Sequence, residues 1–188
     1  MSDAAEAETT VIVLDYLAHG HGSDGRRFDS GPLAQAIDVD HMRLYELNLT
    51  DDSDASIGDR LTLRPRDDGI EEFREIGYSD LSTGAETELE YVIEETVEGD
   101  PERFVTVYNE AQPITLRLHQ LNLLPGIGDK LRDDILDARK RQPFADFVDV
   151  ADRVSGLHDP ISVIQDRILE ELRGDDIKYA LFRDDGPF

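Results

Sequence analysis

The feature that most constrains the fold of this chain is a pair of glycines, Gly126 and Gly128, that bracket a single apolar residue. Apolar residues recur at helical spacing on both sides, so the sequence predicts two helices joined by a very tight turn, the first from about residue 115 and the second over residues 129–141. The glycines allow backbone conformations that a Cβ would penalise, and they leave space beside the N–H groups that begin the second helix. These groups carry the positive end of the helix dipole, and the expected ligand is therefore an anion.

The same segment resembles the helix-hairpin-helix motif of nucleic-acid-binding proteins. In that motif an apolar residue and a free position precede Gly-apolar-Gly, and a basic residue follows two positions later; the matching residues are Leu124, Pro125, Gly126, Ile127, Gly128 and Lys130. The alternative is a tight corner between two helices that binds nothing. The motif often has a small residue four positions after the second glycine, where this chain has Arg132. This departure puts docking on duplex DNA in doubt more than phosphate binding, and it favours RNA.

The net charge of −24 and the pI near 4.3 argue at first against a polyanion as partner. The charge is unevenly distributed, however. Residues 115–141 carry 6 basic and 4 acidic side chains, whereas residues 1–114 carry 8 and 28, and residues 142–188 carry 5 and 11. The predicted hairpin therefore lies in the one basic segment of the sequence.

The basic residues include only three lysines, and the acidic residues are spread along the whole chain. This composition is typical of proteins from salt-loaded cytoplasms, and it predicts a halophilic protein. At molar salt the Debye length falls to about 3 Å, so negative charge no longer excludes nucleic-acid binding. The same salt weakens Lys and Arg contacts with phosphate, so binding would depend on backbone N–H groups and stacking. An acidic protein of an ordinary cytoplasm, with a protein partner, is the alternative.

Several classes of function are not expected. The absence of Cys excludes disulfides, thiolate metal sites and cysteine catalysis. His19 and His21 lie near Asp15 and Asp24, but no third ligand follows at a recognisable spacing, so no metal is expected. No phosphate-loop, Rossmann or nucleophile-elbow motif is present, and no carboxylate spacing marks an acid and base pair. The sequence thus predicts a protein without catalysis or cofactor. With no membrane-spanning run and an acidic, disordered start over residues 1–9, we expect it in the cytoplasm.

The first part of the chain has the pattern of short strands. Residues 10–17, 32–37, 41–49, 57–63 and 70–76 are β-prone and are separated by turn signals. Five such strands over residues 10–78 predict a small closed or partly open barrel, and the step at residues 57–61 resembles one found in OB-type barrels. Such barrels bind single strands on a basic, aromatic face. The candidates for that face are Arg43, Tyr45, Arg60 and Arg64, although solvated arginines and a half-buried tyrosine would give the same pattern.

After residue 78 the apolar period becomes helical. Asp80 is predicted to cap one helix, and Asp100 followed by Pro101 to begin another, so residues 79–113 should form connecting helices. Residues 114–174 should form a helix-hairpin-helix domain whose second hairpin, at residues 155–160, is degenerate and structural. Residues 175–188 should form a C-terminal strand, over residues 177–182 and able to dock on the barrel, and a tail. The predicted fold class is α+β, with an N-terminal five-stranded OB-like β-barrel followed by an all-α helix-hairpin-helix domain.

Four segments, at residues 78–81, 117–128, 143–144 and 178–182, together resemble one archaeal family. It is catalogued as domain of unknown function 655 and is described as RNA- or nucleotide-binding. The resemblance extends over roughly residues 11–182 and is most specific at residues 117–128. It implies an OB-like barrel, a helical domain with the hairpin, and RNA as partner, with ribosomal components as candidates. No established activity comes with it.

We therefore predict a non-catalytic protein that binds RNA, or alternatively DNA, through backbone phosphate. The predicted site combines the hairpin with nearby basic residues: Gly126, Ile127, Gly128, Lys130, Arg117, His119, Arg139, Lys140 and Arg141. His119 is equally compatible with a satisfied helix histidine, and the last three residues with stabilisation of a helix C-terminus. A protein-interaction or assembly factor with a structural hairpin is the rival prediction, and a nucleotide-binding enzyme is the third.

Overall fold

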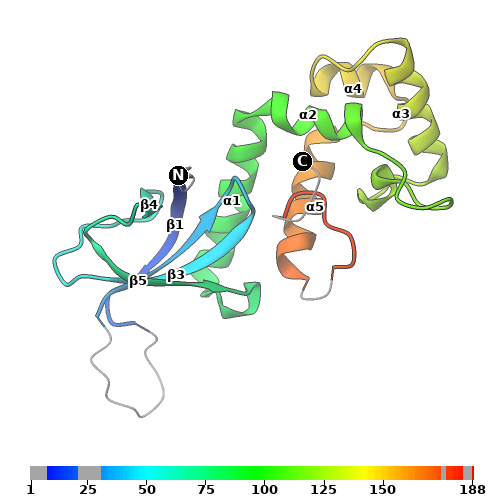
Figure 1. Cartoon of the computed structure of the whole chain (residues 1–188). Helices are drawn as coiled ribbons and strands as arrows, with labels where there is room; N and C mark the ends of the chain where they lie inside the picture. The colour runs from blue at the N-terminus through cyan, green and yellow to red at the C-terminus, as the bar shows by residue number, and fades with distance from the viewer. Residues whose placement is uncertain (1–7, 21–30, 175–176, 184–187) are drawn as a thin grey trace, which may run out of the picture. The chain divides into compact units, whose positions relative to one another are not determined.

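The computed structural model describes residues 8–20, 31–174, 177–183 and 188. Contacts divide the chain into two compact units, Met1–Tyr91 and Val92–Phe188, with the boundary inside helix α1 (Thr83–Gly99). In the described residues five strands come first and five α-helices follow (Figure 1), which confirms the mixed α+β class. The disordered start was predicted for residues 1–9, of which residues 1–7 lie outside the described residues.

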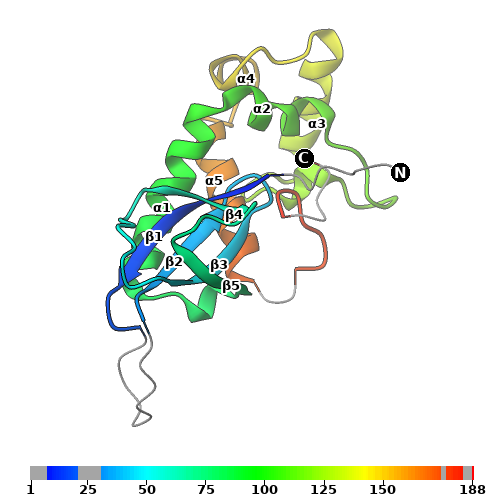
Figure 2. The same cartoon turned by 60° about the vertical axis from the view of Figure 1, so that its left-hand side comes forward.

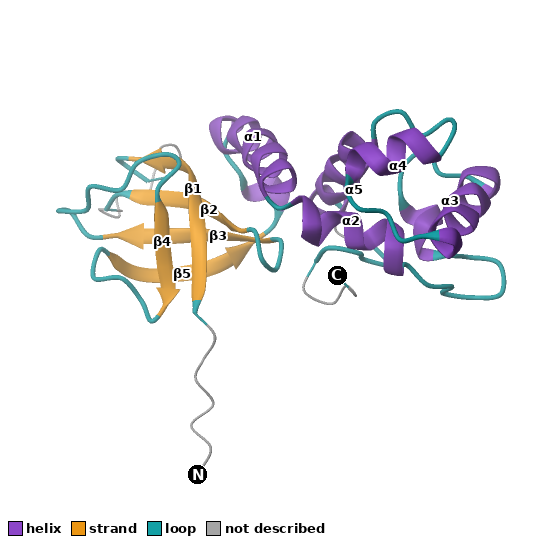
Figure 3. Ribbon diagram, turned by 90° about the horizontal axis from the view of Figure 1, so that it is seen from above, coloured by secondary structure: helices purple, strands orange, loops and turns teal. Residues whose placement is uncertain are grey.

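The first unit is built on one antiparallel sheet. Its strands are β1 (Thr9–Leu17), β2 (Leu33–Asp38), β3 (Arg43–Leu49), β4 (Arg60–Arg64) and β5 (Ile70–Ile76), in the order β4-β1-β2-β3-β5. All five predicted strands are present. The sheet curls into a half-barrel with β4 and β5 at its two edges (Figures 2 and 3).

Alternate residues of each strand fill the inside of the curl, as a period of two requires. This core consists of Val11, Val13, Ala34, Ala36, Tyr45, Leu47, Leu49, Ala55, Leu63 and Ile70. The ring of Tyr45 meets the edge of Phe73 at a centroid distance of 6.0 Å. Tyr45 was a candidate for a basic, aromatic binding face, but its ring packs in the apolar core, so this candidate is corrected and Tyr45 is closer to the alternative of a half-buried tyrosine.

The start of α1 lies against the opposite face of the sheet. Ser82 donates a hydrogen bond from its hydroxyl to Asp15 and accepts one from the N–H of Ala85 at 3.0 Å, so Ser82 caps α1. The fully buried Gln35 bonds both the Asp80 carbonyl (2.9 Å) and the Ser82 N–H (2.7 Å). The Asp80 carboxylate accepts from the N–H of Gly77 in a short 3₁₀ turn, η1 (Tyr78–Asp80). Ser82 therefore caps α1, and not Asp80 as predicted.

The second unit contains the last part of α1, α2 (Pro101–Glu110), the 3₁₀ helix η2 (Gln120–Leu123), α3 (Asp129–Arg141), α4 (Phe147–Arg153) and α5 (Pro160–Arg173). Asp100 caps α2 with Pro101 in its first turn, as predicted. Tyr108 is fully buried and donates to the Pro160 carbonyl at 2.8 Å, which ties α2 to α5. Asn109 makes two hydrogen bonds with the backbone of Phe144, at 2.7 and 2.9 Å, which fix the segment between α3 and α4.

The C-terminal segment is held by Glu171, which is fully buried on α5. Its carboxylate accepts hydrogen bonds from the backbone N–H groups of three consecutive residues, Leu181, Phe182 and Arg183, at 2.6 to 3.2 Å, and from Arg167 at 2.8 Å. Because these three N–H groups converge on one carboxylate, the segment turns around it and forms no strand. The terminal strand predicted over residues 177–182 is therefore absent, and the described contacts of this segment are with α5 and with Phe104 of α2.

Candidate functional site

We call the tight turn at residues 124–128, which leads into α3, the first corner. Its two glycines have different backbone conformations. Gly126 has φ +77°, the left-handed region that favours glycine, and the N–H of Ile127 closes the turn on the Leu124 carbonyl at 3.2 Å. Gly128 has φ −83° and ψ −174°, which any residue adopts. A Cβ added at Gly128 would meet no other atom within 4 Å, so the space beside it is open.

The helix predicted before this corner does not form, and that prediction was wrong. Residues 113–119 make a turn in which the Thr115 hydroxyl accepts from the N–H groups of Arg117 (3.2 Å) and Leu118 (3.0 Å). The N–H of Ile114 donates to the Leu118 carbonyl at 2.8 Å. A threonine hydroxyl can offer N–H groups an alternative to the helical ladder, and here it does so. Between α2 and the corner, the short 3₁₀ helix η2 is the helical segment that the structure shows. We call residues 113–119 the 113–119 turn.

Helix α3 begins after the corner as predicted, with Gly128 at its N-cap and no side-chain cap. The first N–H groups of a helix have no partner within the helix. Among the α-helices of the described residues, the other four are capped by a hydroxyl or a carboxylate, from Ser82, Asp100, Asp146 and Asp159. The open N–H groups at the start of α3 are therefore a distinguishing feature of the first corner.

The second corner, between α4 and α5, repeats the geometry of the first. Gly156 has φ +95°, and the N–H of Leu157 closes the turn on the Val154 carbonyl at 3.2 Å. Here, however, the Asp159 carboxylate caps α5 by accepting from the Ser162 N–H at 3.0 Å and from its hydroxyl at 2.7 Å. These bonds lower the pKa of Asp159. The chain thus has two similar corners, one open and one closed by a carboxylate.

Two of the predicted basic residues have structural roles. His119 is 6% exposed, and its Nδ1 accepts a hydrogen bond from the Leu121 N–H at 3.1 Å, which caps η2. Burial, with the nearby charges of Arg139 and Arg132, lowers the pKa of His119. Arg139 donates to the carbonyls of Tyr108 (3.2 Å) and Ala111 (2.8 Å) at the end of α2. The hydrogen bond of His119 is therefore satisfied within the fold, whereas Arg139 contacts the end of α2 and not the C-terminus of its own helix, which was the alternative that the sequence left open.

The other predicted cations are exposed, but they differ in their partners. Lys130 pairs with Asp134 at 2.8 Å, and Lys140 pairs with Asp137 at 3.7 Å. Arg117 and Arg141 are exposed, and their side chains make no hydrogen bond or ion pair with the described part of the chain. By helical rise, Arg141 lies about 18 Å from the start of α3, so the basic residues at the end of α3 are not brought to the first corner.

Arg132, which raised a doubt about the hairpin, spans the corner. Its side chain is 20% exposed, and the guanidinium donates to Asn122 Oδ1 in η2 at 3.3 Å. It also pairs with Asp129 at 2.8 Å and with Asp133 at 2.9 Å. The arginine therefore joins η2 to α3 and neutralises the two aspartates nearest to it.

A hollow of about 500 Å³ lies between the 113–119 turn and the start of α3. It is lined by Pro113, Thr115, Leu116, Arg117, Leu118, His119, Asp129 and Arg132. The structure thus brings Arg117 and His119 together with the first turn of α3, as the sequence predicted, whereas Leu116 was missed. No signal in the sequence singled out this residue, because it was expected to lie in a helix.

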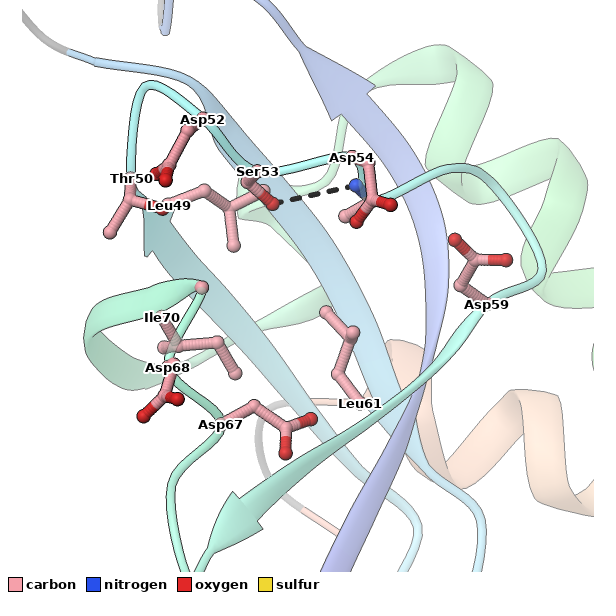
Figure 4. A pocket seen from close by; sticks show the side chains of 12 residues that line it. Leu49, Thr50, Asp52, Ser53, Asp54, Asp59, Leu61, Asp67, Asp68 and Ile70 are labelled. Atoms are coloured by element: carbon pink, nitrogen blue, oxygen red, sulfur yellow. Dashed lines mark hydrogen bonds between the residues drawn. The ribbon is translucent and has the colours of Figure 1, made fainter.

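The half-barrel has a different character. A hollow of about 370 Å³ at its mouth has an apolar floor and five aspartates: Asp52, Asp54, Asp59, Asp67 and Asp68 (Figure 4). This hollow was not predicted, although its aspartates cluster in two turn segments of the sequence. Among the predicted barrel residues, Arg60 and Arg64 are exposed on the edge strand β4, and Arg43 pairs with Glu75 at 3.4 Å. Because the mouth is acidic, it would repel a polyanion.

Within the described residues, no three His, Cys, Asp or Glu side chains are grouped so that they could hold a metal ion. His21 and Asp24, named in the sequence analysis, lie outside these residues. None of the helices described has both the length and the apolar character that crossing a membrane requires.

These features define the class: a mixed α+β protein in which an antiparallel half-barrel precedes a helical unit with two glycine corners. The family model described as "Protein of unknown function (DUF655)" matches residues 7–184, and the chain belongs to this family. It is 35% identical over 178 residues to the uncharacterised protein MJ0038 of Methanocaldococcus jannaschii. The matched region covers 93% of this chain and 79% of that protein. The crystal structure of Af1531 from Archaeoglobus fulgidus, of the same family, is similar with a TM-score of 0.81 and 36% identity, over 93% of this chain and 98% of the other.

Proposed function

We propose that this protein binds RNA without catalysing a reaction, and that the first corner binds a backbone phosphate through the N–H groups at the start of α3. One observation carries the proposal: of two corners with the same glycine geometry, the second is capped by Asp159 and the first is open. Open N–H groups at a helix N-terminus attract anions through both hydrogen bonding and the helix dipole.

The surroundings of the first corner support an anionic ligand. Arg117 lines the adjacent hollow with an exposed guanidinium, and Arg132 neutralises Asp129 and Asp133. Lys130, two residues after Gly128, is exposed although it pairs with Asp134. Exposed pairs of this kind contribute little energy, so Lys130 can exchange its partner for a phosphate at small cost.

The proposal extends to the architecture. We infer that the half-barrel is a partly open OB-like barrel and that the helical unit is a helix-hairpin-helix domain with paired corners. The first inference is supported by the five curled antiparallel strands, and the second by the matching turns at Gly126 and Gly156. The acidic, lysine-poor composition supports a halophilic protein of a salt-rich cytoplasm. RNA is the partner that the family resemblance suggests, with ribosomal components as candidates.

A substitution that places a carboxylate at the N-cap of α3, as Asp159 does at the N-cap of α5, tests this proposal. In Gly128→Asp the new carboxylate would accept from the open N–H groups and would repel phosphate. Because the backbone at Gly128 suits any residue and no atom lies within 4 Å of the added Cβ, the variant should fold with an unchanged or higher Tm. We expect the RNA recovered by crosslinking in cells at native salt to fall at least tenfold.

The control is Val148→Asp, which adds the same charge on α4 at a side chain that is 68% exposed. It should recover as much RNA as the wild type. If folded Gly128→Asp also retains the wild-type yield, the first corner binds no phosphate. Recovery of proteins without RNA would then favour an assembly factor, a rival that the acidic hollow of the half-barrel supports because it suits a basic protein.

A further inference from the structure

Leu116 is fully exposed at the tip of the 113–119 turn. The turn is fixed by the two hydrogen bonds to the Thr115 hydroxyl and by the bonds from Ile114 and Thr115 to the Leu118 carbonyl, at 2.8 and 3.0 Å. At the base of the turn Pro113 pairs with His119, and the N–H of Gln120 donates to the Gln112 carbonyl at 2.9 Å. The backbone therefore holds a large apolar side chain in water at a defined position.

The position of Leu116 relates it to the first corner. Leu116 and Arg117 line the same hollow as Asp129 and Arg132 of α3, within one compact unit. The hollow, at about 500 Å³, is within the range of volumes that take small ligands or a single planar group. A nucleotide whose phosphate is bound at the start of α3 would therefore have its base within reach of the turn.

The charges on α3 limit how far a nucleic acid can follow the helix. Asp133, Asp134 and Asp137 lie between the first turn and the basic C-terminal turn. A long duplex along α3 would place its phosphates against these carboxylates, whereas a short contact at the first corner would not.

We propose that Leu116 is an apolar wedge that packs against an exposed base next to the bound phosphate. This inference rests on the proposed function. In a continuous duplex the base faces are stacked and offer no surface to such a side chain. Single strands, bulges and loops expose them, and proteins insert apolar side chains at such steps. The substrate class is therefore RNA with an unstacked step, and Leu116 selects it against continuous duplex.

The test uses two hairpin oligoribonucleotides with the same stem, one with a single-nucleotide bulge beside 2-aminopurine and the other fully paired. Fluorescence anisotropy gives the Kd, and 2-aminopurine brightness reports unstacking. We expect the wild type to bind the bulged probe about tenfold more tightly than the paired one and to brighten it, since burying a leucine side chain is worth at least about this much. Leu116→Ala should reduce the preference to less than twofold, and Leu116→Phe should restore it.

Val148→Ala, which removes another exposed apolar side chain of the same unit, is the matched control and should behave as the wild type. An equal preference in the wild type and in Leu116→Ala overturns the wedge but not phosphate binding. Unchanged binding of both probes by Gly128→Asp overturns the proposed function itself. If the wild type binds neither probe, both inferences are overturned.

Discussion

At the scale of the residue, two glycines of one short motif have separate reasons to be glycine. Gly126 is required by its backbone, since φ +77° would strain a residue with a Cβ. Gly128 is required neither by its backbone nor by packing. A glycine at an N-cap is tolerated, but Ser, Asp or Asn would cap the helix better. The absence of a side chain at Gly128 therefore costs helix stability and leaves the N–H groups accessible, which is consistent with the proposed phosphate site.

His119 makes the stability of the helical unit depend on pH. Its pKa in the folded protein is lowered, because burial and two arginines disfavour its charged form. In the unfolded chain the pKa is about 6.5, so below that pH the unfolded chain binds a proton that the folded protein does not. The stabilisation is complete above about pH 6.5 and is lost as the pH falls below it.

We therefore expect the Tm to fall more between pH 7.5 and 5.5 in the wild type than in His119→Asn. The asparagine can still cap η2 but does not titrate. Thermal melts followed by circular dichroism measure the difference, and the variant corrects for every other titrating group. Parallel pH profiles of the two proteins would show that His119 does not contribute.

At the scale of the element, local signals in the sequence predicted all five strands, the start of α2 and the start of α3. The failures have a common physical reason, which is that one side chain has several possible hydrogen-bond partners. A helix was expected to begin at about residue 115, but the Thr115 hydroxyl closes a turn instead. Asp80 was expected to cap α1, but Ser82, two residues later, does so.

The candidate site was predictable to the same extent. The corner is a local feature, so Gly126 and the start of α3 could be identified from their spacing. The partners of the basic residues are not local. Arg139 bonds carbonyls of α2 about thirty residues earlier in the chain, which no spacing in the sequence indicated. A basic residue near a motif therefore predicts a positive charge, but not whether that charge is free.

The C-terminal segment gives a prediction at this scale. Glu171→Gln would remove the buried charged partner of Arg167 and would weaken the bonds to three backbone N–H groups. Removing one partner of a buried ion pair typically costs about 3–5 kcal/mol. We expect a loss of this size in urea unfolding and faster trypsin cleavage after Lys178. The neighbouring Glu170→Gln, whose exposed carboxylate lies 3.7 Å from Arg167, should change the stability by less than about 0.5 kcal/mol. Equal losses in both variants would contradict the assigned role of Glu171.

At the scale of the whole molecule, the charge of −24 is the dominant property. Unpaired carboxylates repel one another more in the folded protein than in the expanded unfolded chain. Raising KCl from 0.1 M to 1 M shortens the Debye length from about 10 Å to about 3 Å and should suppress this repulsion. We expect the Tm to rise by several degrees over this range. A parallel melt in sucrose is the comparison, because sucrose stabilises the folded state by exclusion from the protein surface and does not screen charge. A Tm that stays level or falls in KCl would show that the surface charge does not limit stability.

The twin corners have one further consequence, for how binding can be measured. A Cβ added at Gly156 would lie 3.4 Å from the Leu131 side chain, so the open corner and the capped corner are close neighbours in one unit. In amide hydrogen exchange, a ligand at the first corner should slow exchange of the N–H groups of residues 128–131. The N–H groups at the start of α5 should exchange as before, because Asp159 already bonds there. The capped corner is therefore an internal reference, and one sample can distinguish a local ligand from a general tightening of the fold.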